Sequence, residues 1–364
     1  MESTALGTLS NHLPDARLSH VDIAKGIAML AIVVVHNPLL MEHGGRIFNG
    51  LLSFALPVFF ISCGALTRPD QAIGASVLSR ARGLLVPYAA TIIAIAVVNR
   101  VLLNRSALPI LWGGLYGTGA TVAWVTLWFL PHLWLVSIAA LLIGRCAEQQ
   151  YLSRLSLTLL AMLLCGAGNV ALHAMYVSFP QLASRGLPFS LDLLPLSLAY
   201  ALVGLAFRVL WLRPRYNVAI FLIAAPVFLL LQFRPDAAMD LNLRRYDNGF
   251  FSTLSALSGA CTVFSLAAGI RNVRCLAPLM TAIGRGSLVI CIFHFPIQQA
   301  LVHRLPVTPL GNAGPISISI LALAFSMSLW WVFSKSSIGR LLFAIKQQPL
   351  EFPRTARPLL TSTS

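Results

Sequence analysis

The chain has 364 residues, of which 57% are hydrophobic and only 10% are charged, and its mean hydropathy is +0.80. Because a soluble domain carries about 25% charged residues, this composition excludes an ordinary soluble protein and indicates a polytopic membrane protein. The net charge of +15 does not point to nucleic acid, since the basic loops of membrane proteins set topology and face anionic lipid.

Ten apolar segments each have close to the roughly 20 residues that a membrane-spanning helix needs. They predict an all-α bundle with both termini on one side, where eighteen of the 26 Lys and Arg residues also fall. The positive-inside rule makes that side cytoplasmic. We expect a cytoplasmic N-terminal segment (1–20), a ten-helix membrane domain (21–335) and a cytoplasmic tail (336–364). The predicted spans are 22–41, 47–66, 84–103, 121–144, 155–177, 190–211, 217–233, 251–270, 286–303 and 315–334.

The first span carries a stripe of ionisable side chains. Lys25 and His36 bracket an apolar run eleven residues apart, which is about 20° around a helix and about 16 Å along it. Asp22, three residues before Lys25, faces the same side. Ionisable groups inside a membrane are costly and mark functional sites, so we favour a site here. The alternative is a lysine that reaches the membrane surface and a histidine that only packs.

The second and third spans hold two further motifs. Pro57 and Gly64 loosen the end of the second span and allow close contact with another helix. Arg80 and Arg82 precede the third span. Arginine binds phosphate in a bidentate way, but paired arginines at a cytoplasmic helix start are also topology signals, and both interpretations stay open. The six cysteines form no C-x-x-C pair and no zinc-ligand spacing, which predicts neither a disulfide framework nor a metal site.

Two later spans contain candidates for lining a cavity. Trp128 suits an interface belt, and His132 follows Pro131, where a broken helix is able to line a cavity. In the ninth span, Ser287 and His294 lie within or beside an apolar run. A second intramembrane histidine indicates either a lined cavity or a hydrogen-bonded packing residue.

Together these motifs resemble the acyltransferase-3 family of integral membrane O-acyltransferases, which modify bacterial surface glycans. The resemblance covers residues 17–335 and is strongest to the fucose-4-O-acetylase and exopolysaccharide O-acetyltransferase branch. Within that branch the chain is similar to acetyltransferases of xanthan-type gum biosynthesis. The motifs occur in the order Asp22…Lys25…His36, Pro57-x-Phe-Phe…Gly64, Arg80-x-Arg82…Pro87-Tyr88, Trp128-Phe-Leu-Pro131 and Gly284…Ser287…His294…Pro296.

The resemblance implies a basic residue eleven positions before an essential histidine, here Lys25 and His36, and we add Asp22 to this catalytic set. Members commonly carry Arg at the first position; Lys keeps the charge but loses the bidentate fork. Members usually have Ser immediately before the glycine of the Phe-Phe motif, where this chain has Cys63. We do not expect Cys63 to be a nucleophile, because no charged partner can be assigned to it.

The resemblance further implies an acyl-CoA donor, acetyl-CoA first, and a lipid-linked or nascent polysaccharide acceptor at the bacterial inner membrane. Lys25, Arg80 and Arg82 are then expected to hold the anionic CoA head. Neutral His36 is expected to take the proton of a sugar hydroxyl that attacks the thioester. The expected partners are acyl-CoA, the glycan and membrane lipid, with no bound cofactor, metal or nucleic acid.

Two other classes of protein fit part of the pattern. A transporter also has ten spans, intramembrane histidines and helix-breaking prolines, but this chain has no repeat relating its halves and no intramembrane carboxylate pair. A non-catalytic subunit of a polysaccharide export assembly explains the bundle but not the stripe of Lys25 and His36. Dependence on acetyl-CoA separates the enzyme from both.

Overall fold

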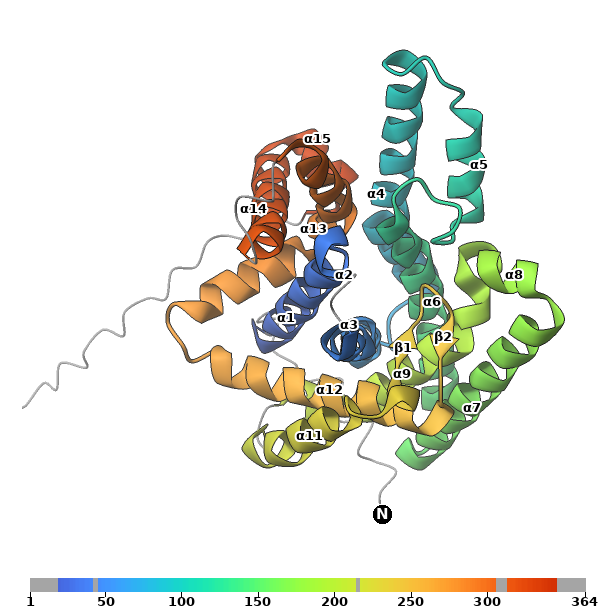
Figure 1. The fold of residues 1–364 in the computed structure, drawn as a ribbon. Coiled ribbons are helices and arrows are strands. Elements are labelled where there is room, and N and C mark those ends of the chain that lie inside the picture. Colours follow the sequence, from blue (N-terminus) through green and yellow to red (C-terminus); the bar gives the residue numbers. More distant parts are fainter. Residues whose placement is uncertain (1–18, 42–44, 214–216, 306–312, 346–364) are drawn as a thin grey trace, which may run out of the picture.

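The computed structural model describes residues 19–41, 45–213, 217–305 and 313–345, which form a helical bundle with one short hairpin (Figure 1). The expectations for residues 1–18 and 346–364 lie outside the described residues. The helices are α1 (Ser19–Val35), α2 (Pro38–Met41), α3 (Gly45–Ala65), α4 (Ile73–Val101), α5 (Leu108–Tyr116), η3 (Val125–Trp128), α6 (Phe129–Gln149), α7 (Arg154–Ser178), α8 (Pro180–Arg185), η4 (Pro188–Leu193), α9 (Leu194–Ala206), α10 (Arg208–Leu212), α11 (Asn217–Leu231), η5 (Pro235–Ala237), α12 (Gly249–Ile270), α13 (Leu276–Arg304), α14 (Ala313–Lys335) and α15 (Ser337–Leu342).

The prediction of an all-helical, polytopic bundle is confirmed. Among the described residues, eight helices are long and apolar enough to cross a membrane, and the apolar stretch 218–231 is shorter. The first predicted span, 22–41, is divided into α1, of 17 residues, and α2. The division falls at Asn37-Pro38 because the residue before a proline disfavours helical backbone angles.

Helix α1 is the core of the bundle. It packs most extensively against α13 and also contacts α3 and α12, and most of its residues are buried. The contact with α13 is close at Gly284, where an added Cβ would overlap the backbone carbonyl of Asp22. Gly64 of α3 approaches the carbonyl of Ala201 on α9 in the same way, as small residues at membrane helix contacts do.

Two helices begin earlier than the sequence predicts. Helix α4 begins at Ile73 rather than at residue 84, so Arg80 and Arg82 lie within a helix and not in a loop before it. Helix α13 begins at Leu276 rather than at residue 286. The added turns of α4 are of mixed polarity and contain Arg80 and Arg82, whereas those of α13 are mainly apolar but are followed by Gly284 and Arg285, which end the apolar window there.

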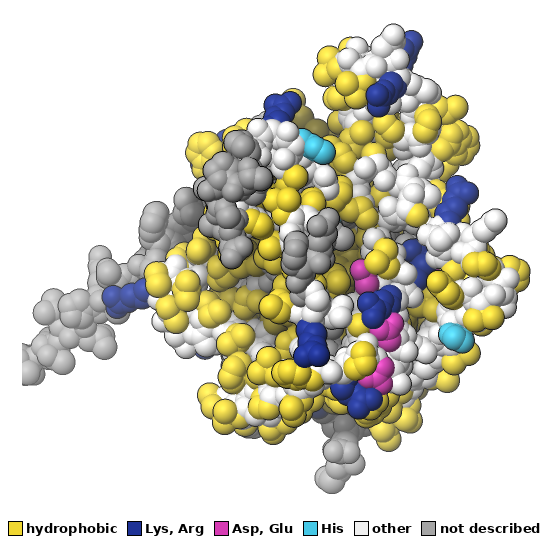
Figure 2. Space-filling model, viewed as in Figure 1, with side chains coloured by type: hydrophobic (Ala, Val, Ile, Leu, Met, Phe, Trp, Pro, Cys, Tyr) yellow, Lys and Arg dark blue, Asp and Glu magenta, His cyan; other side chains and the backbone are white. Residues whose placement is uncertain are grey.

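A two-stranded hairpin interrupts the all-helical pattern, which the sequence does not predict. Strand β1 (Met239–Asp240) pairs with β2 (Arg245–Tyr246) in antiparallel register, and β1 packs against α3. Figure 2 shows a mostly hydrophobic face on which charged side chains gather around this hairpin. A buried ion pair joins Arg244 to Asp192 of η4 at 2.8 Å and ties the hairpin to the bundle.

Candidate active site

Two histidines meet where α1 ends against α13. The ring centroids of His36 and His294 are 5.3 Å apart, and the rings are arranged edge to face. His294 is fully buried, whereas His36, just beyond the last residue of α1, is partly exposed. Its backbone N–H still bonds to the carbonyl of Ile32 at 3.2 Å, so the helical spacing from Lys25 is preserved. The structure therefore brings together two residues that the sequence proposed separately.

Hydrogen bonds fix the tautomer of both neutral imidazole rings. Nδ1 of His36 donates to the carbonyl of Ile32 at 2.8 Å, and Nδ1 of His294 donates to the carbonyl of Ile290 at 2.7 Å. Because a carbonyl only accepts, each neutral ring carries its proton on Nδ1 and presents an unprotonated Nε2. Within the described residues neither Nε2 has a hydrogen-bond partner. Both nitrogens are thus available as acceptors or bases.

Gln298 belongs to the same cluster, and the sequence analysis missed it. It is fully buried one helical turn after His294, and its Nε2 donates to the carbonyl of Val33 at 2.8 Å. Its Oε1 is buried without a donor among the described residues. A polar residue four positions after His294 on an apolar helix is the signal that identifies it.

At the other end of α1, Lys25 lines a pocket of about 220 Å³ between α1, α3, α4, α6 and α13. Ser287 and Cys291 of α13 also line it, and Cys291 lies three residues, or about 4.5 Å along the helix, before His294. The pocket walls are otherwise mainly apolar. The same seam of α1 and α13 therefore has a cation and a pocket at one end and the histidine pair at the other.

The two arginines of α4 differ in their surroundings. Arg80 is partly buried, and its charge acts on Cys63, as does that of Lys25. Four residues after Arg80, Leu84 lines the pocket. Arg82 is exposed, because two residues correspond to about 200° around the helix. The charges of both Arg80 and Lys25 act on Cys63, a link that the sequence analysis did not assign because it depends on α4 extending back through Arg80.

Asp22 lies at the lysine end of α1 and not beside His36. It is buried, and its carboxylate is 3.7 Å from Nε of Arg285 on α13. Fourteen residues of helix separate it from His36, which corresponds to about 21 Å. Asp22 therefore joins α1 to α13 through Arg285 and does not contact His36.

His132 and Trp128 form a separate cluster in α6 and η3. Nδ1 of His132 donates to the carbonyl of Phe189 at 3.2 Å, and Nε2 accepts from Ser197 Oγ at 2.8 Å. The indole of Trp128 packs on the His132 ring with centroids 5.5 Å apart. Both side chains are buried, and neither lines the pocket beside Lys25.

Asp240, in the hairpin, is a second residue that the sequence analysis missed. The charges of Asp240 and His36 act on one another, although the two residues are far apart in sequence. Burial raises the pKa of the Asp240 carboxyl, while the backbone N–H of Leu243, a protonated His36 and Arg245 oppose that rise. The hairpin thus brings an acidic group to the histidine end of α1.

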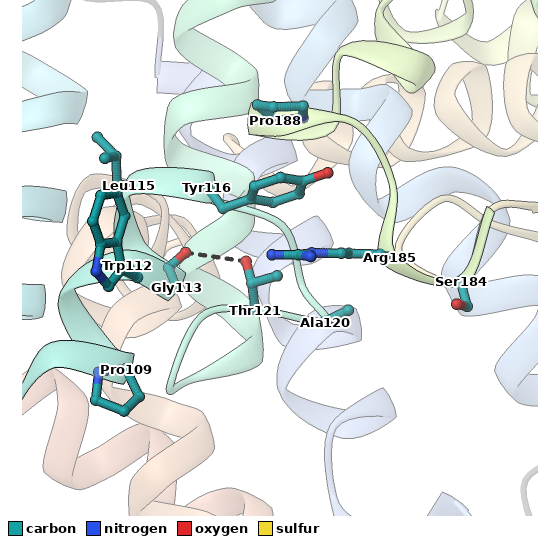
Figure 3. Close-up of a pocket in the computed structure, with 10 residues that line it drawn as sticks. All are labelled: Pro109, Trp112, Gly113, Leu115, Tyr116, Ala120, Thr121, Ser184, Arg185 and Pro188. Carbon is teal, nitrogen blue, oxygen red and sulfur yellow. Dashed lines mark hydrogen bonds between the residues drawn. The ribbon is translucent and has the colours of Figure 1, made fainter. Parts of the chain in front are cut away.

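A larger cleft of about 950 Å³ lies between α5, α8 and the segment after α5 (Figure 3). The guanidinium of Arg185 lies over the ring of Tyr116, 4.3 Å from its centroid. Thr121 Oγ1 donates to the carbonyl of Gly113 at 3.0 Å. None of the candidate residues named from the sequence lines this cleft, so we treat it as separate from the histidine pair.

Comparison with known families places the chain in one of them. The acyltransferase-3 family profile, described as an acyltransferase domain, matches residues 18–335. The chain belongs to the acyltransferase-3 family. Comparisons with curated proteins and with solved structures give no match. Acyltransferase-3 membership and the helical bundle together make this a multi-pass membrane acyltransferase. The matched residues include all of α1 and α13.

Proposed function

We propose that the protein transfers an acetyl group from acetyl-CoA to a hydroxyl of a bacterial surface or exopolysaccharide sugar, as in the fucose-4-O-acetylase and exopolysaccharide O-acetyltransferase branch. The observation that carries this proposal is the unprotonated Nε2 of His36, which has no hydrogen-bond partner among the described residues and lies beside His294, in a chain of the acyltransferase-3 family. Acyl transfer to an alcohol needs a base at the hydroxyl, and a neutral imidazole supplies it.

The donor binds at the lysine end of α1. Lys25 lines the pocket of about 220 Å³, Arg80 lies one turn before its lining residue Leu84, and both attract the phosphates of CoA. The apolar walls accept the pantetheine arm, which extends along the seam towards Cys291 and the histidines. Exposed Arg82 adds only a screened, longer-range attraction.

The reaction takes place at the histidine end. Nε2 of His36 accepts the proton of the sugar hydroxyl while the hydroxyl oxygen attacks the thioester carbonyl. The tetrahedral intermediate then collapses with cleavage of the C–S bond, and the proton leaves with the CoA thiolate. Asp240 stabilises the imidazolium that forms, because an opposite charge favours the protonated ring.

In this proposal the two substrates reach the enzyme from opposite sides of the bacterial inner membrane. With both termini in the cytoplasm, Lys25 lies at the cytoplasmic side, whereas His36 and the β1–β2 hairpin lie towards the periplasm. A reporter fused after Lys346 is then expected to read as cytoplasmic, and one inserted beside Arg244 and Arg245 as periplasmic. Opposite signals would remove the support for donor entry at Lys25.

Two measurements test the function. Protein purified in lipid nanodiscs is expected to transfer label from [¹⁴C]acetyl-CoA to the polysaccharide of a deletion strain. The surface polysaccharide of that strain is expected to lack acetyl ester signals that the parent shows in its proton NMR spectrum. Unchanged ester content, together with no use of acetyl-CoA, would refute the proposal.

A further inference from the structure

We propose that His294 and Gln298 form a subsite for a second hydroxyl of the acceptor, adjacent to the hydroxyl that reacts at His36. The acceptor is then a sugar unit with two neighbouring free hydroxyls, and only one of them is acylated. This inference rests on the proposed function, because it takes His36 as the base.

The first support is an excess of hydrogen-bond acceptors in one buried place. His294 and Gln298 are both 0% exposed and lie one turn apart on α13. Their donor atoms are used, since Nδ1 of His294 donates to Ile290 and Nε2 of Gln298 donates to Val33. Their acceptor atoms, Nε2 and Oε1, receive no hydrogen bond from the described residues.

The second support is the position of these acceptors. The His294 ring lies 5.3 Å from that of His36, and Val33, the partner of Gln298, is three residues before His36 on α1. All three polar side chains therefore lie within about one helical turn of each other at the α1–α13 seam. A molecule bound at His36 is in reach of the other two.

The chemistry of the cluster favours a ligand that brings hydrogen-bond donors. Two neutral imidazoles that both present an acceptor cannot bond to one another, and buried acceptors without donors are unfavourable. A thioester carbonyl, a carboxylate or a fully ionised phosphate brings only further acceptors. Neighbouring hydroxyls bring donors: one gives its proton to His36 and forms the ester bond, and the other donates to His294 or Gln298 without reacting.

The test uses the unesterified oligosaccharide repeat of the parent polysaccharide and its synthetic monodeoxy analogues with labelled acetyl-CoA. The analogue without the reacting hydroxyl should give no product. The analogue without the neighbouring hydroxyl should lose roughly 10-fold to 100-fold in kcat/KM with the wild-type protein. In the double variant His294→Phe, Gln298→Leu the intact repeat and the neighbouring-deoxy analogue should have the same kcat/KM. The kcat/KM for the intact repeat should fall to that of the deoxy analogue.

Two single variants keep the result interpretable. His294→Gln retains a buried acceptor and should restore part of the discrimination. Ser326→Ala alters a fully buried polar residue on neighbouring α14 whose hydroxyl donates to the carbonyl of Ala322 in its own helix, and should leave the ratio unchanged. Equal rates for the intact repeat and the neighbouring-deoxy analogue in the wild type would mean that only water meets these acceptors, and would overturn the subsite. A wild-type protein that acetylates neither would instead overturn the proposed function.

Discussion

His132 and His294 are both fully buried histidines near a proline of an apolar helix, yet their hydrogen bonding differs. His132 uses both ring nitrogens to join α6 to η4 and α9, through Phe189 and Ser197. Among the described residues, His294 uses only Nδ1, and that bond stays within its own helix. The first ring therefore fixes the position of helices, and the second leaves a nitrogen for a ligand.

The comparison shows what a buried histidine in a membrane protein indicates. Burial alone does not separate a structural from a functional residue, because both rings have no exposed surface. The number of satisfied ring nitrogens separates them, since a buried polar group without a partner is unfavourable unless a substrate supplies one. His36 is partly exposed and also has a single nitrogen bonded within the described part of the chain, so it belongs with His294.

The largest expected effect is at His36. His36→Ala should lower acetyl transfer in cells by about 10²-fold to 10⁴-fold, the usual contribution of a general base. The ester content of the surface polysaccharide, measured by proton NMR, checks this, and immunoblotting of membranes should show near-normal abundance. Near-normal ester content would mean that His36, like His132, has a structural role.

A matched substitution sharpens the contrast between the two buried rings. His132→Phe keeps a ring of similar size but leaves the Ser197 hydroxyl and Phe189 carbonyl without their partner. It should lower the free energy of unfolding by about 1–3 kcal/mol. His294→Phe removes no bond between the described helices and should leave the free energy of unfolding nearly unchanged. Thermal unfolding of both purified variants measures the difference, and equal losses would mean that the two rings have the same structural role.

The donor end offers a second matched pair. Arg80→Gln should raise the KM for acetyl-CoA by roughly 10-fold, because it removes a charge-assisted contact made in both ground and transition state. Arg82→Gln should change the KM less than threefold, and the effect of either should shrink at high salt. Steady-state kinetics in nanodiscs checks both. If the Arg82 variant had the larger effect, CoA would have to bind on the outer face of α4.

The smallest effect concerns Asp240. Its ionised carboxylate favours the protonated form of the neighbouring imidazole, so Asp240→Asn should make His36 easier to deprotonate. The acidic limb of the pH–kcat/KM profile should therefore move to lower pH, while the rate at neutral pH falls only a few-fold. A limb that stays in place would show that Asp240 does not act on the base in the working enzyme.

The sequence predicts what depends on local periodicity. The alignment of Lys25 with His36 follows from their spacing on one helix, and the apolar segments correspond to the helices of the bundle. The difference between Arg80 and Arg82 was not predictable, because it depends on a helix that starts eleven residues before the apolar window, at Ile73.

The rest of the site depends on contacts between distant segments. Asp240 reaches His36 only because a hairpin packs on α3, and no pattern of apolar residues indicates that hairpin. The satisfied state of His132 depends on Ser197 and on a backbone carbonyl of η4, neither of which is recognisable from the sequence around His132. Hydrogen-bond completeness is a tertiary property and has to be read from the structure.

The most direct test compares His36→Gln with His132→Gln in purified protein. Glutamine hydrogen-bonds but takes no proton at neutral pH, so it separates base catalysis from packing. The measurement is transfer of [¹⁴C]acetyl from acetyl-CoA to the de-esterified polysaccharide, per folded molecule, in nanodiscs. We expect His36→Gln to lie at least about 100-fold below the wild type and His132→Gln to stay within a few-fold of it. Near-wild-type transfer by His36→Gln would contradict the assignment of His36 as the base.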